Sequence, residues 1–233
     1  MNSLGQDFQA IVIGATGGIG AAFVEHLSND PHCARVLTFS RESAPAIDIT
    51  VEDSVQAAAE HAREQFGSVQ LIIDATGALT IDGHPPEKTI ARLAPEVMAR
   101  AFAINAIGPA LLFKHFAPLL PHRERAIFAT LSARVGSIAD NRKGGWISYR
   151  AAKAALNQIV RTAAIEIAFR HPQAVCVGLQ PGTVRTPLSK PYARGGDILE
   201  PAESTRRLLT VLDELSPEAS GGLFDHAGNA IPG

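Results

Sequence analysis

The sequence predicts one doubly wound α/β domain built on a parallel sheet, with a Rossmann-type dinucleotide site. The chain has 233 residues, and α/β folds often run to about 250 residues as one unit. It is 46% hydrophobic and 19% charged, so it can bury a core and is too apolar for a disordered chain. Short β-rich runs alternate with longer segments of helical spacing, a pattern typical of a parallel sheet covered on both faces.

The predicted elements alternate along the whole chain without a repeat or a flexible linker. The strands are expected at residues 10–13, 35–39, 71–73, 126–131, 174–179 and 222–224. The helices are expected at residues 19–27, 54–66, 95–120, 147–170 and 201–215, with a bend near Gly108 and Pro109 in the third. Pro201 starts the last helix, where the missing N–H costs little.

The stretch from about 183 to 200 is rich in Gly and Pro and is long for a plain connection. Loops of this length are usually functional, so we expect a substrate lid here. Ser189, Tyr192 and Arg194 are its candidate substrate contacts.

Charge and composition exclude several classes of protein. With 21 basic and 23 acidic residues, the net charge is −2, which argues against a strongly basic nucleic-acid surface. Two cysteines cannot build a disulfide scaffold, and the eight histidines include no helical pair at metal-ligand spacing. Neither an uninterrupted run of roughly 18 apolar residues nor a secretory leader pattern is present. We expect a cytoplasmic protein without a metal, nucleic-acid or membrane partner.

A glycine-rich loop follows the first predicted strand and opens the first helix. Gly14 allows a sharp turn, Gly18 allows the backbone to approach a pyrophosphate, and Gly20 allows close packing of helix and strand. The N–H groups near Ile19 then face the phosphates at a helix N-terminus. The whole segment Gly14 to Gly20, with Thr16 and Gly17, is therefore a predicted phosphate site; the alternative is an ordinary glycine-rich turn.

Ser40 and Arg41 end the second predicted strand. Enzymes that choose NAD often have an acidic residue here for the ribose 2′-OH. A serine hydroxyl and a guanidinium suit a 2′-phosphate better, so NADP(H) is predicted over NAD(H). Alternatively, Arg41 is a solvated loop residue.

Tyr149 and Lys153 are four residues apart in a predicted helix and face the same way. An ammonium near a phenol lowers the tyrosine pKa, and such a tyrosine can protonate a carbonyl oxygen or deprotonate an alcohol. With a nicotinamide as the hydride source, the pair predicts an oxidoreductase. The alternative is a surface pair on an amphipathic helix.

The order of these motifs resembles the short-chain dehydrogenase/reductase family from end to end, at the size of its single-domain classical type. The features that carry the resemblance are Gly14, Gly18 and Gly20, Asp48, Asp74-Ala75-Thr76-Gly77, Asn105, Ser132, Tyr149 with Lys153, and Pro181-Gly182. Ser137-Ile138, Gly144-Gly145 and the closing Gly221-Gly222-Leu223-Phe224-Asp225 resemble the branch of C-factor signalling proteins and sniffer-type carbonyl reductases.

The resemblance implies roles for further residues. Asp48 and Ile49 would meet the adenine, and Ala75, Thr76 and Gly77 would line its ribose. Asn105 would help to hold a water near Lys153, which would also bind the nicotinamide ribose. Pro181, Gly182, Val184 and Thr186 would hold the nicotinamide end.

The sequence departs from the family pattern at two places. Asp74 stands where the family has Asn. The catalytic serine of the family lies three residues before a glycine, and that place before Gly136 is Ala133. Ser132 is its neighbour, and adjacent strand residues point to opposite faces, so Ser132 can substitute only if the strand has ended there. Ser132 is the predicted catalytic serine, with Ser137 as the substitute.

The predicted function is reduction of a ketone or aldehyde with NADP(H), or the reverse oxidation of an alcohol. The alternative is an NADP(H)-binding regulatory protein of C-factor type with little turnover. Trp146 either walls the substrate pocket or belongs to the core. A homodimer or homotetramer is expected, paired through the apolar helices at 99–120 and 151–169.

Overall fold

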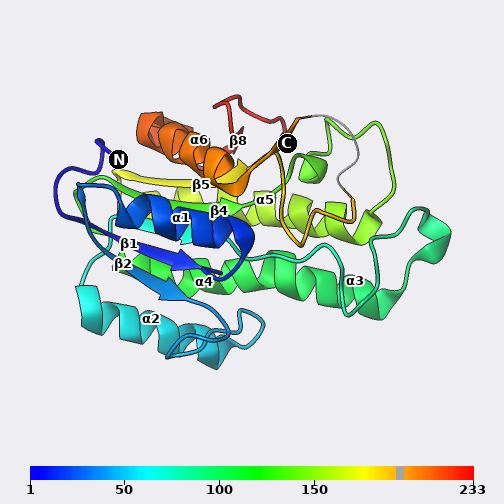
Figure 1. The fold of residues 1–233 in the computed structure, drawn as a ribbon, viewed down its shortest axis with the longest axis horizontal. Coiled ribbons are helices and arrows are strands. Elements are labelled where there is room, and N and C mark those ends of the chain that lie inside the picture. The colour runs from blue at the N-terminus through cyan, green and yellow to red at the C-terminus, as the bar shows by residue number, and fades with distance from the viewer. Residues whose placement is uncertain (193–196) are drawn as a thin grey trace.

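A parallel six-stranded sheet forms the centre of the molecule (Figure 1). The computed structural model describes residues 1–192 and 197–233. The strands are β1 (Phe8–Ile13), β2 (Cys33–Phe39), β3 (Leu71–Asp74), β4 (Ala126–Leu131), β5 (Ala174–Gln180) and β8 (Leu223–Asp225), in the spatial order β2-β1-β3-β4-β5-β8. All neighbouring pairs are parallel. The predicted doubly wound α/β fold is confirmed.

Helices cover both faces of the sheet, and each face has its own apolar core. The helices are α1 (Gly18–Ser28), α2 (Glu52–Phe66), α3 (Pro95–Phe102), α4 (Gly108–Phe116), α5 (Ile147–Ala168) and α6 (Pro201–Glu214). Residues of α1 and α6, including Phe23 and Leu208, bury one face. Residues of α2, α4 and α5, including Leu112 and Leu156, bury the other.

Short elements complete the described chain. Single 3₁₀ turns lie at Ile90–Arg92, Ala117–Leu119, Arg134–Gly136 and Pro217–Ala219. The expected lid region contains two two-residue strands, β6 (Thr183–Val184) and β7 (Ile198–Leu199), which pair in parallel. The sequence prediction missed this small sheet because two-residue strands have no readable period.

The predicted helix at 95–120 is continuous, but its distortion lies earlier than expected. One π-helical turn, Ala103–Ile107, separates α3 from α4. Pro109 has no N–H to donate to the carbonyl of Asn105, and a π turn just before it accommodates that loss. By length and composition alone, this one described helical stretch, Pro95–Leu119, could cross a membrane, although the core helix of a soluble protein passes the same test.

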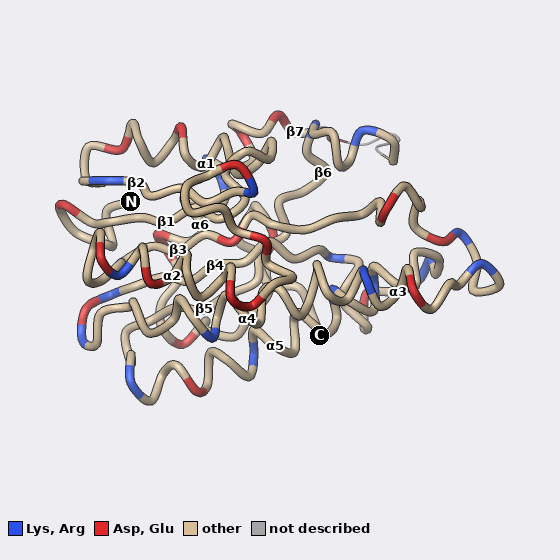
Figure 2. The backbone as a smooth tube through the Cα atoms, turned by 90° about the horizontal axis from the view of Figure 1, so that it is seen from below, with Lys and Arg blue, Asp and Glu red and all other residues tan. Residues whose placement is uncertain are grey.

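The strand order reverses at β1, which lies between β2 and β3. The loops after β1 and β3 therefore lead away to opposite faces and leave a crevice at the carboxyl ends of the strands, the usual place for a ligand in such sheets. Charged residues of both signs are spread over the chain rather than segregated by sign (Figure 2).

Candidate active site

A cavity of about 400 Å³ lies at this crevice. Ten of the residues predicted to bind cofactor line it, and they come from the loops after β1, β2 and β3 and from the segment before α2. These are Gly14, Thr16, Gly17, Ser40, Arg41, Asp48, Ile49, Ala75, Thr76 and Gly77. The structure thus brings together the phosphate loop and the predicted adenosine residues.

The glycine loop leaves no room for side chains where the backbone is closest. Gly14 has a φ of +83°. A Cβ at Gly20 would lie 2.1 Å from the Gly14 carbonyl oxygen, and a Cβ at Gly18 would lie 2.9 Å from Cγ2 of Thr186. Packing within the protein therefore requires glycine at these positions, and the residues of the loop fit a dinucleotide. Thr186, predicted for the nicotinamide end, lies against this loop.

Two arginines face the adenosine end of the cavity. Arg41 was predicted, whereas Arg100, on α3, was missed because no motif marks it; it lies one turn before Ile104, and both line the cavity. Hydrogen bonds from Thr50 hold the pKa of Asp48 low, and Arg100 and Arg41 lower it further. Ser40 is buried, and its Oγ accepts a hydrogen bond from the Glu42 N–H at 3.1 Å.

Lys153 lies buried at the centre of the site. Its Nζ donates to the carbonyl oxygen of Leu131 at 2.8 Å and lies 5.9 Å from the centroid of the Tyr149 ring. A Cβ at Gly136 would lie 2.9 Å from the Lys153 Cβ, so the turn after β4 packs directly on α5. The predicted pair is therefore together, on α5, at the end of β4.

Burial sets the proton affinities of this pair. It raises the pKa of Tyr149 to about 12. It lowers the pKa of Lys153 to about 8, and the Asp74 carboxylate opposes that change. Burial therefore acts against the lowering of the tyrosine pKa that the sequence predicted, because it disfavours the charged phenolate. At neutral pH Tyr149 is a protonated acid.

Asn105 and Asp74 support the loop after β3. The Asn105 side chain accepts from the Ala78 N–H at 3.1 Å and donates to the carbonyl oxygens of Ala78 and Ala101 at 2.9 and 3.1 Å. Asp74 is fully buried and accepts hydrogen bonds from Thr76 and Thr130; burial nevertheless raises its pKa. Asp74 thus stands where the family has Asn, and its carboxylate has hydrogen-bond partners in that place.

Comparison with known proteins identifies the family. A family model described as enoyl-(acyl carrier protein) reductase matches residues 15–213. The chain belongs to the short-chain dehydrogenase/reductase family. This confirms the resemblance seen in the motifs.

Known members of the short-chain dehydrogenase/reductase family resemble the chain in sequence and in fold. The C-signal protein of Myxococcus xanthus is 39% identical over 135 residues, 58% of this chain and 78% of that protein. The NADPH-bound carbonyl reductase from chicken fatty liver is 25% identical and superposes with a TM-score of 0.84 over 98% of this chain and 100% of its own. The carbonyl reductase Sniffer of Drosophila melanogaster shares the fold, with a TM-score of 0.83 at 21% identity over the same shares.

Ser132 and Ser137 are the two candidates for the catalytic serine of the family. Strand β4 ends at Leu131. Ser132 therefore lies outside the strand, which is the condition under which it can replace the family serine. The Ser132 hydroxyl, however, donates to Oδ1 of Asn157 at 2.6 Å. Ser137 is buried and accepts from the Asp140 N–H at 3.1 Å. Ser132 as the catalytic serine stays a prediction.

The residues predicted for the nicotinamide end of a short-chain dehydrogenase/reductase do not line the 400 Å³ cavity. The carbonyl oxygen of Pro181 accepts from the Ser204 hydroxyl at 2.7 Å, Val184 is buried in β6, and Gly182 lies against His226. Of the lid contacts, Ser189 donates to the carbonyl oxygen of Val184. Arg194 lies outside the described residues.

Proposed function

We propose that the protein is an NADP(H)-dependent carbonyl reductase, which also runs the reverse alcohol oxidation. The observation that carries the proposal is the pair of half-buried Tyr149 and buried Lys153 on α5, in a chain whose loops after β1, β2 and β3 line a cavity that fits a dinucleotide. An acid that stays protonated at neutral pH is the group that a carbonyl oxygen needs when its carbon receives a hydride. A bound nicotinamide cofactor would supply that hydride.

Residues of the chain would donate the proton, stabilise the charge that it leaves behind and position the substrate. Tyr149 gives its Oη proton to the substrate oxygen. Lys153 stabilises the phenolate left behind and is oriented by its bond to the Leu131 carbonyl. Asn105 holds the loop that carries Gly77 and Ala78, and Ser132 steadies the substrate oxygen. The segment 183–200 is the proposed lid, and its residues 193–196 lie outside the described residues.

Arg41 supports NADP(H) as the cofactor, and so does Arg100, which lines the same cavity. A doubly charged 2′-phosphate gains most from guanidinium groups, and the chicken carbonyl reductase, with the same fold, holds NADPH. Replacing Arg41 by Ala should shrink the preference for NADPH over NADH. An unchanged preference would remove this part of the proposal.

The test is NADPH consumption with a panel of ketones, aldehydes and diketones, with Tyr149→Phe as the matched variant. Loss of the general acid should lower turnover by roughly 10²- to 10⁴-fold while NADPH binding persists. Equal turnover in both proteins would remove Tyr149 from the chemistry.

A regulatory protein that binds NADP(H) with little turnover is the second candidate. Ala133 removes the hydroxyl that family enzymes place there, and C-signal is among the relatives. NADPH that binds but is not oxidised with any carbonyl compound would favour this candidate. A cytoplasmic location, the absence of nucleic-acid and membrane partners, and a homodimer or homotetramer stay predictions.

A further inference from the structure

Trp146, the only tryptophan of the chain, is held beside Tyr149 by an unusual backbone. Gly144, Gly145 and Trp146 have φ angles of +61°, +66° and +56°, three left-handed residues in a row directly before α5. Such a conformation costs free energy in a residue with a bulky side chain, and non-glycine residues of this kind cluster at functional sites. The observation therefore calls for a role for this side chain.

Hydrogen bonds fix this turn in place. The Trp146 N–H donates to the carbonyl oxygen of Glu87, whose buried carboxylate accepts from the N–H and hydroxyl of Ser148. The guanidinium of Arg150 donates to the carbonyl oxygen of Gly145 at 2.9 Å. The backbone that carries the indole is thus fixed before any ligand binds, as suits a binding platform.

The indole contacts two tyrosine rings. Its centroid is 6.4 Å from that of Tyr149 and 5.6 Å from that of Tyr192, both edge to face. The Tyr192 hydroxyl is 2.7 Å from that of Thr80, so the segment after β6 is joined to the segment after β3. The aromatic wall therefore runs from the proposed acid to the start of the lid.

A cavity of about 360 Å³ lies along this wall. Pro85, Pro86, Val97, Trp146 and Tyr192 give it an apolar side, and His84, Glu87, Lys88 and Arg92 also line it. A smaller cavity that Tyr149 lines shares His84, Pro85, Pro86, Glu87 and Val97 with it, so the two cavities adjoin. Aromatic pairs gain free energy beyond the area they bury, so the rings of Trp146 and Tyr192 favour an aromatic ligand over a saturated one.

We propose that this cavity is the substrate site for planar aromatic ketones and aldehydes, and that Trp146 is the residue that positions their ring. The inference rests on the proposed function for its chemistry, but the aromatic preference is a property of the cavity and can be tested as binding. The ring lies against the indole, and the carbonyl group points to Tyr149.

Turnover is compared for acetophenone and cyclohexyl methyl ketone, which have the same carbon skeleton in aromatic and saturated form. We expect a higher kcat/KM for acetophenone. Trp146→Leu should lower the ratio of the two values by roughly 3- to 10-fold, the size of an aromatic contact, whereas Trp146→Phe should keep most of it. Phe169→Leu is the matched control because Phe169 is 83% exposed. An unchanged ratio in Trp146→Leu overturns the inference.

Binding is measured separately through the emission of Trp146, in the Tyr149→Phe variant with NADP⁺ so that no alcohol is consumed. The probes are 1-phenylethanol and 1-cyclohexylethanol. A response at lower concentration for the aromatic alcohol, weakened in the additional variant Tyr192→Leu, supports the aromatic site even if neither ketone is reduced and the proposed function fails. Equal responses to both alcohols overturn it.

Discussion

At the scale of a single residue, the pKa of Lys153 predicts how kcat/KM depends on pH. A lysine is cationic below its pKa, which burial lowers to about 8, and Tyr149 stays protonated until about 12. The cation is needed to stabilise the phenolate, so kcat/KM for reduction should be level below pH 7 and fall about tenfold per pH unit above the lysine pKa. The pH profile of initial rates measures this limb.

The variant Lys153→Arg provides the control for that limb. An arginine stays charged throughout the accessible range, so the variant should be slower overall but lose the alkaline fall near pH 8. If the wild-type protein kept its full rate well above pH 8, Lys153 would not need its charge for the reaction.

Substitutions at positions 132 and 133 test which serine donates to the substrate oxygen. Ser132→Ala removes the predicted donor to the substrate oxygen and should lower kcat/KM by about tenfold, the value of one hydrogen bond to a developing charge. The double variant Ser132→Ala with Ala133→Ser moves a hydroxyl to the family position and should recover the loss. Full turnover in Ser132→Ala alone would instead leave Ser137 as the candidate.

Single residues show where sequence reasoning succeeds and where it stops. Gly14, Tyr149 and Lys153 could be predicted because backbone turns and helical spacing are local properties. Arg100 and the contact of Ser132 with Asn157 could not, since they depend on how α3 and α5 pack against segments far away in the sequence. The raised pKa of Tyr149 likewise follows from burial, which spacing does not reveal.

At the scale of elements, the π turn at Ala103–Ile107 gives the next prediction. It places Asn105 where its side chain bonds both backbone groups of Ala78. Asn105→Ala leaves these groups without their partners, so the free energy of unfolding should fall by about 2–3 kcal/mol and kcat should fall with it. Urea unfolding measures the first effect.

Asn2→Ala serves as the control for that measurement, because Asn2 is exposed and should change the free energy of unfolding little. An Asn105→Ala protein with unchanged stability would show that water replaces the amide.

The strands and long helices could be predicted from their periods. The π turn and the β6–β7 pair could not, because a proline effect on its neighbours and a two-residue strand leave no periodic signal.

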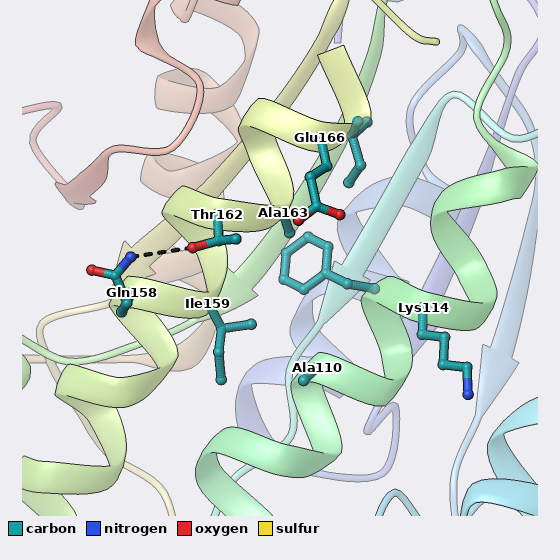
Figure 3. A pocket seen from close by; sticks show the side chains of 9 residues that line it. Ala110, Lys114, Gln158, Ile159, Thr162, Ala163 and Glu166 are labelled. Atoms are coloured by element: carbon teal, nitrogen blue, oxygen red, sulfur yellow. Dashed lines mark hydrogen bonds between the residues drawn. The ribbon is translucent and has the colours of Figure 1, made fainter. Parts of the chain in front are cut away.

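At the scale of the whole molecule, a groove lies between α4 and α5. It has a volume of about 450 Å³ and is lined by apolar residues such as Phe113, Ile159 and Ala163. Figure 3 shows the labelled side chains of the two helices around it, with Lys114 on one and Glu166 on the other. An apolar surface that carries both signs of charge suits a contact between two identical copies.

We therefore expect the protein to dimerise through this groove and Ala163→Arg to break the dimer. A guanidinium in the centre of an apolar contact would lose its water without gaining a partner, a cost of several kcal/mol, whereas in a monomer the same side chain can reach solvent from half-buried Ala163. Sedimentation velocity at micromolar concentration should show a dimer for the wild type and a monomer for the variant. Ala57→Arg, on an exposed position of α2, should remain dimeric. A wild-type protein that sediments only as a monomer rules out the pairing, and a dimer that survives Ala163→Arg places the interface elsewhere.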